Sequence, residues 1–162
     1  MRDDGAALGV DLGTGSVKVA VVSADGAVQA KSSRSYPLSS PHPGWAEADP
    51  REWLSATQAA VTELGDAVAS ASGAGFSGQM HGLVLCDAQL EPVRPAITWA
   101  DARAGSEAAN MQAELGDEVL ARLGSPAVSG FAATSLRWVA RHEPAALKAA
   151  TYALQPKDWL RA

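Results

Sequence analysis

The segment DLGTGSVK, residues 11–18, brings one carboxylate, two glycines, two hydroxyls and one lysine close together in the sequence. Backbone N–H groups and hydroxyls in such a turn form a concave set of donors that suits phosphate oxygens. Asp11 could hold a Mg²⁺ directly or through its waters, and Lys18 could add a cation to the same anion. A plain hairpin turn capped by Asp11 explains the same residues, and spacing alone leaves both interpretations open.

Two familiar phosphate-binding motifs are excluded for this segment. A Walker loop needs the pattern GxxxxGK[ST], and a dinucleotide fingerprint needs a third glycine where this chain has Lys18. The residues that follow the turn also predict a strand rather than a helix. A phosphate site here would therefore be of another kind.

The residues around this motif predict three consecutive antiparallel strands. Residues 8–12 are a short apolar run, and residues 17–22 alternate with a period of two. Asp25-Gly26 is a hairpin signal, because this pair tolerates the positive φ that such turns need. Residues 27–36 then return as a third and more polar strand, nearer an edge of the sheet.

A helix is predicted to begin after the proline-rich loop at residues 37–50. Asp49 suits an N-cap, Pro50 suits the first helical position, and Glu52 completes a capping box. The apolar residues after Glu52 follow helical spacing. The loop and the helix therefore separate the first three strands from the rest of the chain.

The remaining segments predict further strands and then helices. Residues 73–82 predict a strand that runs into a glycine-lined loop, and residues 83–100 predict a hairpin that turns near 87–90. From residue 101 the pattern is helical with a break at 124–126, and a short strand and the start of another helix follow. This order predicts a mixed α/β sheet with helices packed against it.

Composition indicates a globular chain with a core of its own: 162 residues, 47% hydrophobic and 19% charged. The net charge of −5 argues against nucleic acid or an anionic membrane as a partner. Cys86 is the single cysteine, so no internal disulfide is expected, and its apolar surroundings predict a buried, inert thiol. The chain shows no signal segment and no run of about 20 apolar residues, so we expect a cytoplasmic protein.

DLGTGSVK resembles the first phosphate segment of the superfamily of sugar kinases, actin and heat-shock ATPases, which share a ribonuclease-H-like fold. Further stretches resemble the FGGY carbohydrate kinases, and among them the branch that phosphorylates xylulose: PHPGWAEADP (41–50), GQMHG (78–82), RPAITWADAR (94–103), RWVARHEP (137–144) and QPKDWLR (155–161). They follow the order and spacing of that family's N-terminal domain. The resemblance implies that residues 1–162 are a partial N-terminal FGGY domain without its C-terminal lobe.

The resemblance also implies which residues bind the nucleotide. Asp11 would organise Mg²⁺ and ATP, and it is the implied metal ligand and catalytic contribution of this chain. The phosphate path would be lined by Gly13, Thr14, Gly15, Ser16 and Lys18.

The sugar would be faced by Gln79, Met80 and His81. Gln79 and His81 supply donors and acceptors that fix hydroxyls, and Met80 gives an adaptable apolar contact. Trp99 would form an apolar wall of the same pocket. Asp101 would accept a hydroxyl, and the alternative for Arg103 is a structural pairing with Asp101 two residues earlier.

The implied activity of the full-length protein is ATP-dependent phosphorylation of D-xylulose to D-xylulose 5-phosphate. A kinase of another sugar or polyol (ribulose, glycerol or gluconate) and a non-catalytic sugar-binding fragment are the alternatives. In the family, the catalytic base, an aspartate, and the lobe that holds adenosine lie beyond residue 162, so we expect this chain alone to be inactive. The resemblance also allows a homodimer of the full-length protein.

Overall fold

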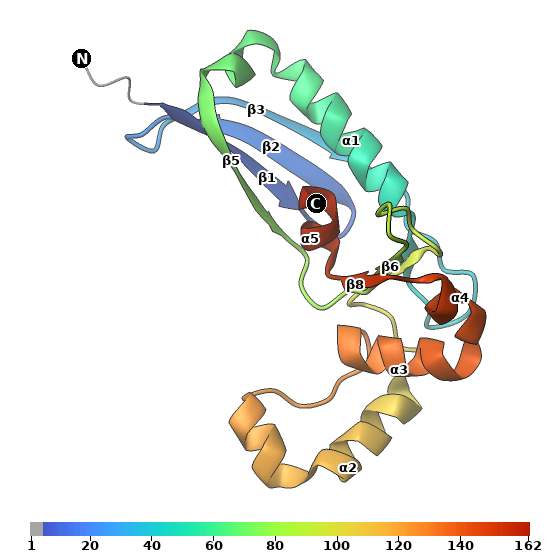
Figure 1. Ribbon diagram of the computed structural model, residues 1–162. Helices are drawn as coiled ribbons and strands as arrows, with labels where there is room; N and C mark the ends of the chain where they lie inside the picture. Colours follow the sequence, from blue (N-terminus) through green and yellow to red (C-terminus); the bar gives the residue numbers. More distant parts are fainter. Residues whose placement is uncertain (1–4) are drawn as a thin grey trace. The chain divides into compact units, whose positions relative to one another are not determined.

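The computed structural model describes residues 5–162, which divide into two structural units (Figure 1). Unit 1 comprises residues 5–37, 51–79 and 161. Unit 2 comprises residues 38–50, 80–160 and 162. The chain therefore passes back and forth between the two units.

Unit 1 is built on a mixed sheet with the strand order β3-β2-β1-β5. The first three strands, β1 (Ala6–Leu12), β2 (Ser16–Val22) and β3 (Val28–Ser35), are antiparallel, and β5 (Ala71–Gly78) pairs with β1 in parallel. These strands confirm the prediction for residues 8–36 and 73–78. The turn at Asp25-Gly26 is confirmed too, since Gly26 has a φ of 87°.

Alternation along the strands gives this sheet one buried face and one open face. The buried face carries Val10, Leu12, Val17, Val19 and Val21. Helix α1 (Pro50–Glu63) covers it, because Ser32 and Arg34, which pair with buried residues of β2, contact Glu63 of that helix. The 3₁₀ helix η1 (Gly65–Ser70) then leads into β5. Asp11 and Lys18 alternate with the buried residues and lie on the open face.

Unit 2 combines short strands with helices. β4 (Glu47–Ala48) pairs with β7 (Ala96–Ile97), and β6 (Val84–Cys86) pairs with β8 (Tyr152–Leu154). The helices are α2 (Gly105–Leu123), α3 (Ala132–His142), α4 (Pro144–Ala149) and α5 (Pro156–Arg161). The core of unit 2 consists of Leu83, Leu85, Ile97, Ala104, Trp138 and Val139.

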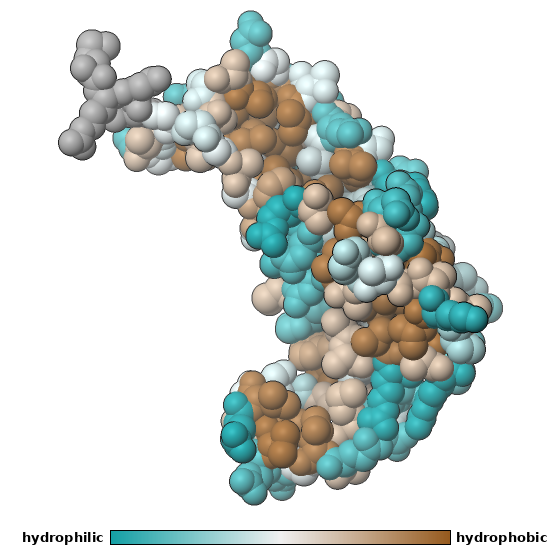
Figure 2. Space-filling view, viewed as in Figure 1, coloured by the Kyte–Doolittle hydropathy of each residue, from teal (hydrophilic) through white to brown (hydrophobic). Residues whose placement is uncertain are grey.

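Helix α2 ends where the sequence predicts a break. Gly124 caps it with a φ of 67°, the left-handed conformation in which glycine is favoured. Apolar side chains gather on the outer part of this helix (Figure 2), where Val119 and Leu123 are exposed. Among residues 5–162, no helix combines the length and the apolar character that a membrane span requires.

The hairpin predicted for residues 83–100 has the expected turn and one strand in each arm, β6 and β7, but these two strands do not form a continuous ladder with each other. Backbone N–H groups in the turn donate to Asp87 Oδ1 at 2.9 Å, and Leu90 adopts a φ of 65°. However, the two arms are joined by isolated bridges and pair mainly with β4 and β8. Pro92 and Pro95 explain this difference, because proline has no N–H to donate to a continuous ladder.

Candidate active site

Four polar residues on the open face of unit 1 lie in one row across the sheet. The ladders pair Asp11 with Lys18, Lys18 with Ser33, and Asp11 with Ser77. Because paired residues share a face, one carboxylate, one ammonium and two hydroxyls rise from adjacent strands. Sequence reasoning found Asp11 and Lys18 but missed both serines, since the parallel pairing of β5 has no local signal.

A groove of about 790 Å³ follows this open face. Its floor includes the small residues Gly9, Ala20 and Gly75, and its polar lining includes Asp11 and Lys18. The small residues leave space above the sheet, so the two charged side chains are accessible to a ligand.

Tyr36 holds the turn at residues 13–16 in a fixed shape. Gly13 N–H donates to the Ser16 carbonyl at 2.9 Å, and Tyr36 N–H donates to the Gly15 carbonyl at 3.2 Å. The Tyr36 hydroxyl donates to the Gly13 carbonyl. Burial and the negative charge of Asp11 raise the pKa of Tyr36 to about 12, which keeps the hydroxyl protonated as a donor. Residues 13–16 therefore form one ordered turn beside Asp11, and Lys18 follows on β2.

Asp11 fits the role of a single protein ligand to Mg²⁺. Its side chain is exposed, and across residues 5–162 no three His, Cys, Asp or Glu side chains come together as a metal site. Mg²⁺ typically keeps several waters and uses one or two carboxylates together with substrate phosphates. One accessible carboxylate next to an ordered turn matches that pattern.

Gln79 directly follows β5 and is the last residue of the 51–79 stretch of unit 1. Its N–H donates to the Leu12 carbonyl at 2.7 Å, and Gly78 permits this approach because a Cβ there would lie 2.7 Å from the same oxygen. The Gln79 side chain is 8% exposed, yet within the described chain neither its Oε1 nor its Nε2 has a hydrogen-bond partner. Such an amide destabilises a protein by about 1–3 kcal/mol, and a ligand with hydroxyls would supply the missing bonds.

The other predicted sugar residues belong to unit 2. An antiparallel bridge joins Leu83 and Ile97 through N–H···O bonds of 2.8 and 3.0 Å. His81 lies two residues before this bridge and Trp99 two residues after it. Met80 and Trp99 are 63% and 51% exposed, which leaves large apolar surfaces available to a ligand.

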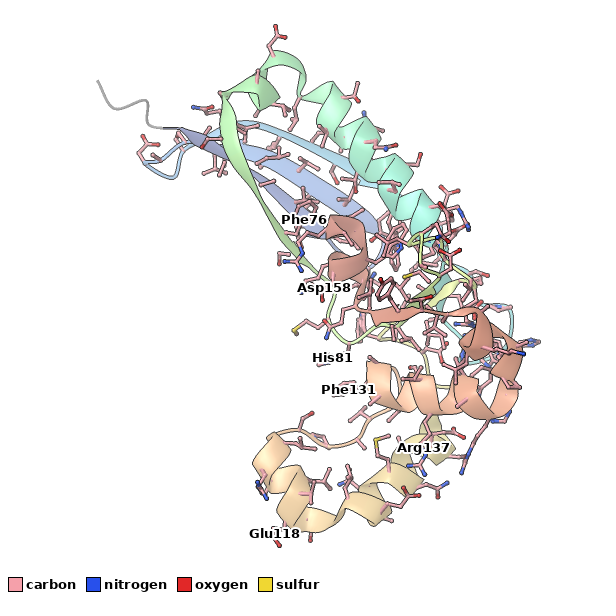
Figure 3. The ribbon with its side chains drawn as sticks, viewed as in Figure 1. Phe76, His81, Glu118, Phe131, Arg137 and Asp158 are labelled. Carbon is pink, nitrogen blue, oxygen red and sulfur yellow. The ribbon has the colours of Figure 1, made fainter. Side chains whose placement is uncertain are left out.

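His81 has an unusual backbone and a closely packed ring. Its φ is 71°, a conformation that residues other than glycine seldom adopt. Its imidazole stacks on the ring of Phe131 with 3.9 Å between centroids and 5° between planes (Figure 3). Phe131 was not among the residues predicted from sequence, because nothing local links it to His81.

Asp101 requires a correction. It is 2% exposed, and both of its oxygens are bound within unit 2. Oδ1 accepts from Arg103 N–H and Nε at 2.8 and 2.9 Å, while Oδ2 accepts from Arg103 Nη2 at 2.8 Å and from Ala46 N–H at 2.6 Å. No oxygen remains exposed for a sugar hydroxyl. The alternative pairing with Arg103 is confirmed.

Arg103 is the centre of a larger group of buried and half-buried side chains, here called the Arg103 cluster: Trp45, Glu47, Arg94, Asp101, Arg103, Trp138 and Glu143. Its guanidinium lies 3.5 Å from the centroid of the Trp45 ring and 5.0 Å from that of Trp138. Glu47 joins Arg103 to Arg94 through contacts of 2.8 and 2.6 Å, and Arg94 also contacts Glu143 at 2.7 Å. Through these contacts the cluster fixes Asp101 and Arg103, and with them the stretch that begins at Trp99.

Known proteins resemble this chain over nearly its whole length. Residues 6–162 match the model of the FGGY family of carbohydrate kinases, N-terminal domain. Xylulose kinase of Escherichia coli K12 is 40% identical over 156 residues, which is 95% of this chain and 32% of that protein. Xylulose kinase of Bacillus subtilis is 36% identical over 158 residues, again 95% of this chain and 32% of the relative.

Solved structures of carbohydrate kinases also superpose on nearly the whole chain. A xylulose kinase from Rhodospirillum rubrum superposes with a TM-score of 0.89 at 35% identity, over 96% of this chain and 34% of that one. A gluconate kinase from Lactobacillus acidophilus gives 0.86 at 25% identity, over 96% and 32%. The predicted ribonuclease-H-like, actin-like ATPase fold is confirmed, and the chain spans about a third of the length of these relatives. The chain belongs to the FGGY family of carbohydrate kinases.

Proposed function

We propose that the whole protein transfers the γ-phosphoryl group of ATP to D-xylulose. The observation that carries the proposal is the buried amide of Gln79, which has no hydrogen-bond partner in the described chain and directly precedes Met80 and His81. A polyhydroxylated ligand would satisfy that amide. The choice of xylulose is supported by relatives named xylulose kinase at 35–40% identity.

Unit 1 is proposed to bind the phosphates. The turn at residues 13–16 would cradle phosphate oxygens with backbone N–H groups and hydroxyls, and Lys18 would add a positive charge. Asp11 would hold Mg²⁺ through its carboxylate or through metal-bound waters. When bound, Mg²⁺ neutralises the charge that develops on the transferred phosphoryl group.

The sugar is proposed to contact the residues that follow β5. Gln79 would exchange hydrogen bonds with sugar hydroxyls, and His81 would present one ring nitrogen as donor and the other as acceptor. Met80 and Trp99 would cover the carbon chain with their exposed apolar surfaces. Asp101 is left out of the sugar contacts because its carboxylate is fully engaged.

The remaining machinery is proposed to come from chain outside residues 1–162. The chain spans about a third of its relatives, which supports a catalytic base and an adenosine-binding lobe beyond this segment. Phosphoryl transfer depends on positioning and on charge stabilisation from both sides of the phosphate. Residues 1–162 by themselves are therefore proposed to be a partial N-terminal FGGY domain that does not turn over substrate.

The second candidate is a kinase of another sugar or polyol. Its support is the similarity to the Lactobacillus acidophilus gluconate kinase, which has a TM-score of 0.86. D-Xylulose, D-ribulose, glycerol and D-gluconate therefore form the panel for an ADP-release assay with the complete natural protein. We expect the highest kcat/KM for D-xylulose, and a higher value for another compound would replace the proposed substrate.

Asp11→Asn tests the phosphate side of the same proposal. Loss of this carboxylate is expected to lower kcat by about a hundredfold or more, as for other groups that stabilise developing charge. Asp25→Asn is the matched control, because Asp25 lies in the exposed β2–β3 turn. Equal turnover of the two variants would remove Asp11 from the proposed site.

A further inference from the structure

We propose that Phe131 is a positioning residue that holds the His81 imidazole in its sugar-binding orientation and thereby sets sugar affinity. The inference rests on the proposed function, because it takes His81 as a sugar contact. It adds a residue that lies far from GQMHG in the sequence and outside every motif recognised above.

The backbone of His81 is already held in place. A φ of 71° persists in a residue other than glycine only where the surroundings fix it. Gly82 packs closely behind it, since a Cβ there would lie 2.9 Å from Pro156 Cγ and 3.1 Å from the Ile97 carbonyl oxygen. The strained backbone therefore fixes where the His81 side chain begins, but it does not fix the plane of the ring.

Phe131 sets that plane. The outer torsion of a histidine side chain has broad minima, so an unstacked imidazole samples several ring orientations. A parallel ring at 3.9 Å restricts this rotation, because tilting the imidazole would either clash with Phe131 or lose the contact. Phe131 covers one face of the imidazole and leaves its edge, which carries both nitrogens, for polar contacts.

Phe131 is itself anchored at the start of α3. Its carbonyl accepts from Thr134 Oγ1 and from Ser135 N–H, both at 2.9 Å. The preceding Gly130 has a φ of 83° and lies so close to the other sugar-facing stretch that a Cβ would be 2.1 Å from the Trp99 carbonyl oxygen. This turn therefore contacts both the stretch that carries His81 and the stretch that carries Trp99. It can hold the two stretches at a fixed distance from each other.

The kinetic test compares Phe131→Leu and Phe131→Tyr in the complete natural protein. Loss of the aromatic face in Phe131→Leu is expected to raise the KM for D-xylulose about three- to tenfold, while the KM for ATP stays unchanged. Phe131→Tyr keeps the face and should restore the sugar KM. Tyr152→Leu removes a half-exposed aromatic ring on β8, at a residue with no assigned ligand contact, and serves as the control.

The structural test observes the histidine ring protons by NMR and needs no activity. His42, His81 and His142 each pack against a different aromatic ring: Trp45, Phe131 and Trp138, respectively. Phe131→Leu should remove the ring-current shift from the His81 signals, identified with His81→Gln, and leave the other two histidines unchanged. Phe131→Met repeats the measurement if the leucine variant does not fold.

Two results would overturn the proposal: His81 signals that do not move in the leucine or methionine variant, or an unchanged sugar KM when they do move. Failure of the proposed function gives a different result. In that case the wild-type protein phosphorylates no sugar in the panel, and the NMR shifts alone then decide whether Phe131 positions His81.

Discussion

Asp11 and Lys18 occupy opposite positions on β1 and β2, on the face of the sheet that α1 does not cover. The carboxylate suits a cation and the ammonium suits an anion, so the two side chains favour different parts of one metal–phosphate ligand. Their positions follow from strand alternation, which buries Val10, Leu12, Val17 and Val19 on the other face. The residues that form the core of unit 1 thereby determine where its charged residues stand.

Gln79→Met should stabilise the protein and weaken sugar binding. Methionine fills a similar volume without an unpaired amide, so the free energy of unfolding should rise by about 1 kcal/mol. Urea titration measures this change, and the sugar KM should rise at the same time. Gln58→Met is the control, because Gln58 lies on an exposed position of α1 and should change neither quantity. A loss of stability in Gln79→Met would show that the amide has a partner in the protein.

Arg103→Met should destabilise unit 2 strongly. The substitution leaves Asp101 buried without its cation and leaves Glu47 with Arg94 alone, and breaking a buried pair in this way costs about 3–5 kcal/mol. Arg137→Met removes an arginine whose partner Glu114 is largely exposed, and it should cost about 1 kcal/mol or less. Chemical denaturation of the two variants side by side makes the comparison, and similar losses would contradict the assigned role of the Arg103 cluster.

Gly130→Ala should be more harmful than Gly124→Ala. Both glycines have positive φ, 83° and 67°, so alanine costs about 1–2 kcal/mol at either position. At Gly124 a Cβ would meet nothing within 4 Å, whereas at Gly130 it would lie 2.1 Å from the Trp99 carbonyl oxygen. The clash should add at least about 1 kcal/mol to the loss for Gly130→Ala, measured by thermal or urea unfolding.

The stability of unit 1 should fall in strong alkali because of Tyr36. Its pKa is raised from 10.0 to about 12 in the folded protein, so the unfolded chain loses this proton first. The contribution is complete below pH 10 and is lost as the pH rises from 10 to about 12. Tyr36→Phe should flatten the stability profile in this window. Tyr152→Phe leaves Tyr36 as the one tyrosine, so its ionisation can be followed by absorbance.

Local signals in the sequence were sufficient for unit 1. A short apolar run predicted β1, period-two alternation predicted β2, Asp25-Gly26 predicted the turn between β2 and β3, and Pro50 marked the start of α1. The row of Asp11, Lys18, Ser33 and Ser77 was only half predicted, because Ser77 reaches it through a parallel pairing between distant segments. Such pairings depend on tertiary packing and not on neighbouring residues.

The residues around the predicted sugar site show what local sequence patterns cannot predict. The short spacing between Asp101 and Arg103 allows either a free carboxylate or an ion pair, and burial between Trp45 and Trp138 decides for the pair. The stacking of Phe131 on His81 joins residues that no periodicity connects. Gln79 was identified by resemblance, but its unsatisfied amide became visible only once its burial was known.

The division of unit 2 into two separate stretches of chain has a consequence for protein engineering. Residues 38–50 and 80–160 share one unit, and they are joined by β4–β7 pairing, by Ala46 N–H on Asp101 and by Glu47 on Arg94. A chimera that takes only the later stretch from a relative would separate these partners and misfold. Sugar preference should therefore be exchangeable between relatives only when both stretches, together with the adjoining Gln79, are taken from the same parent.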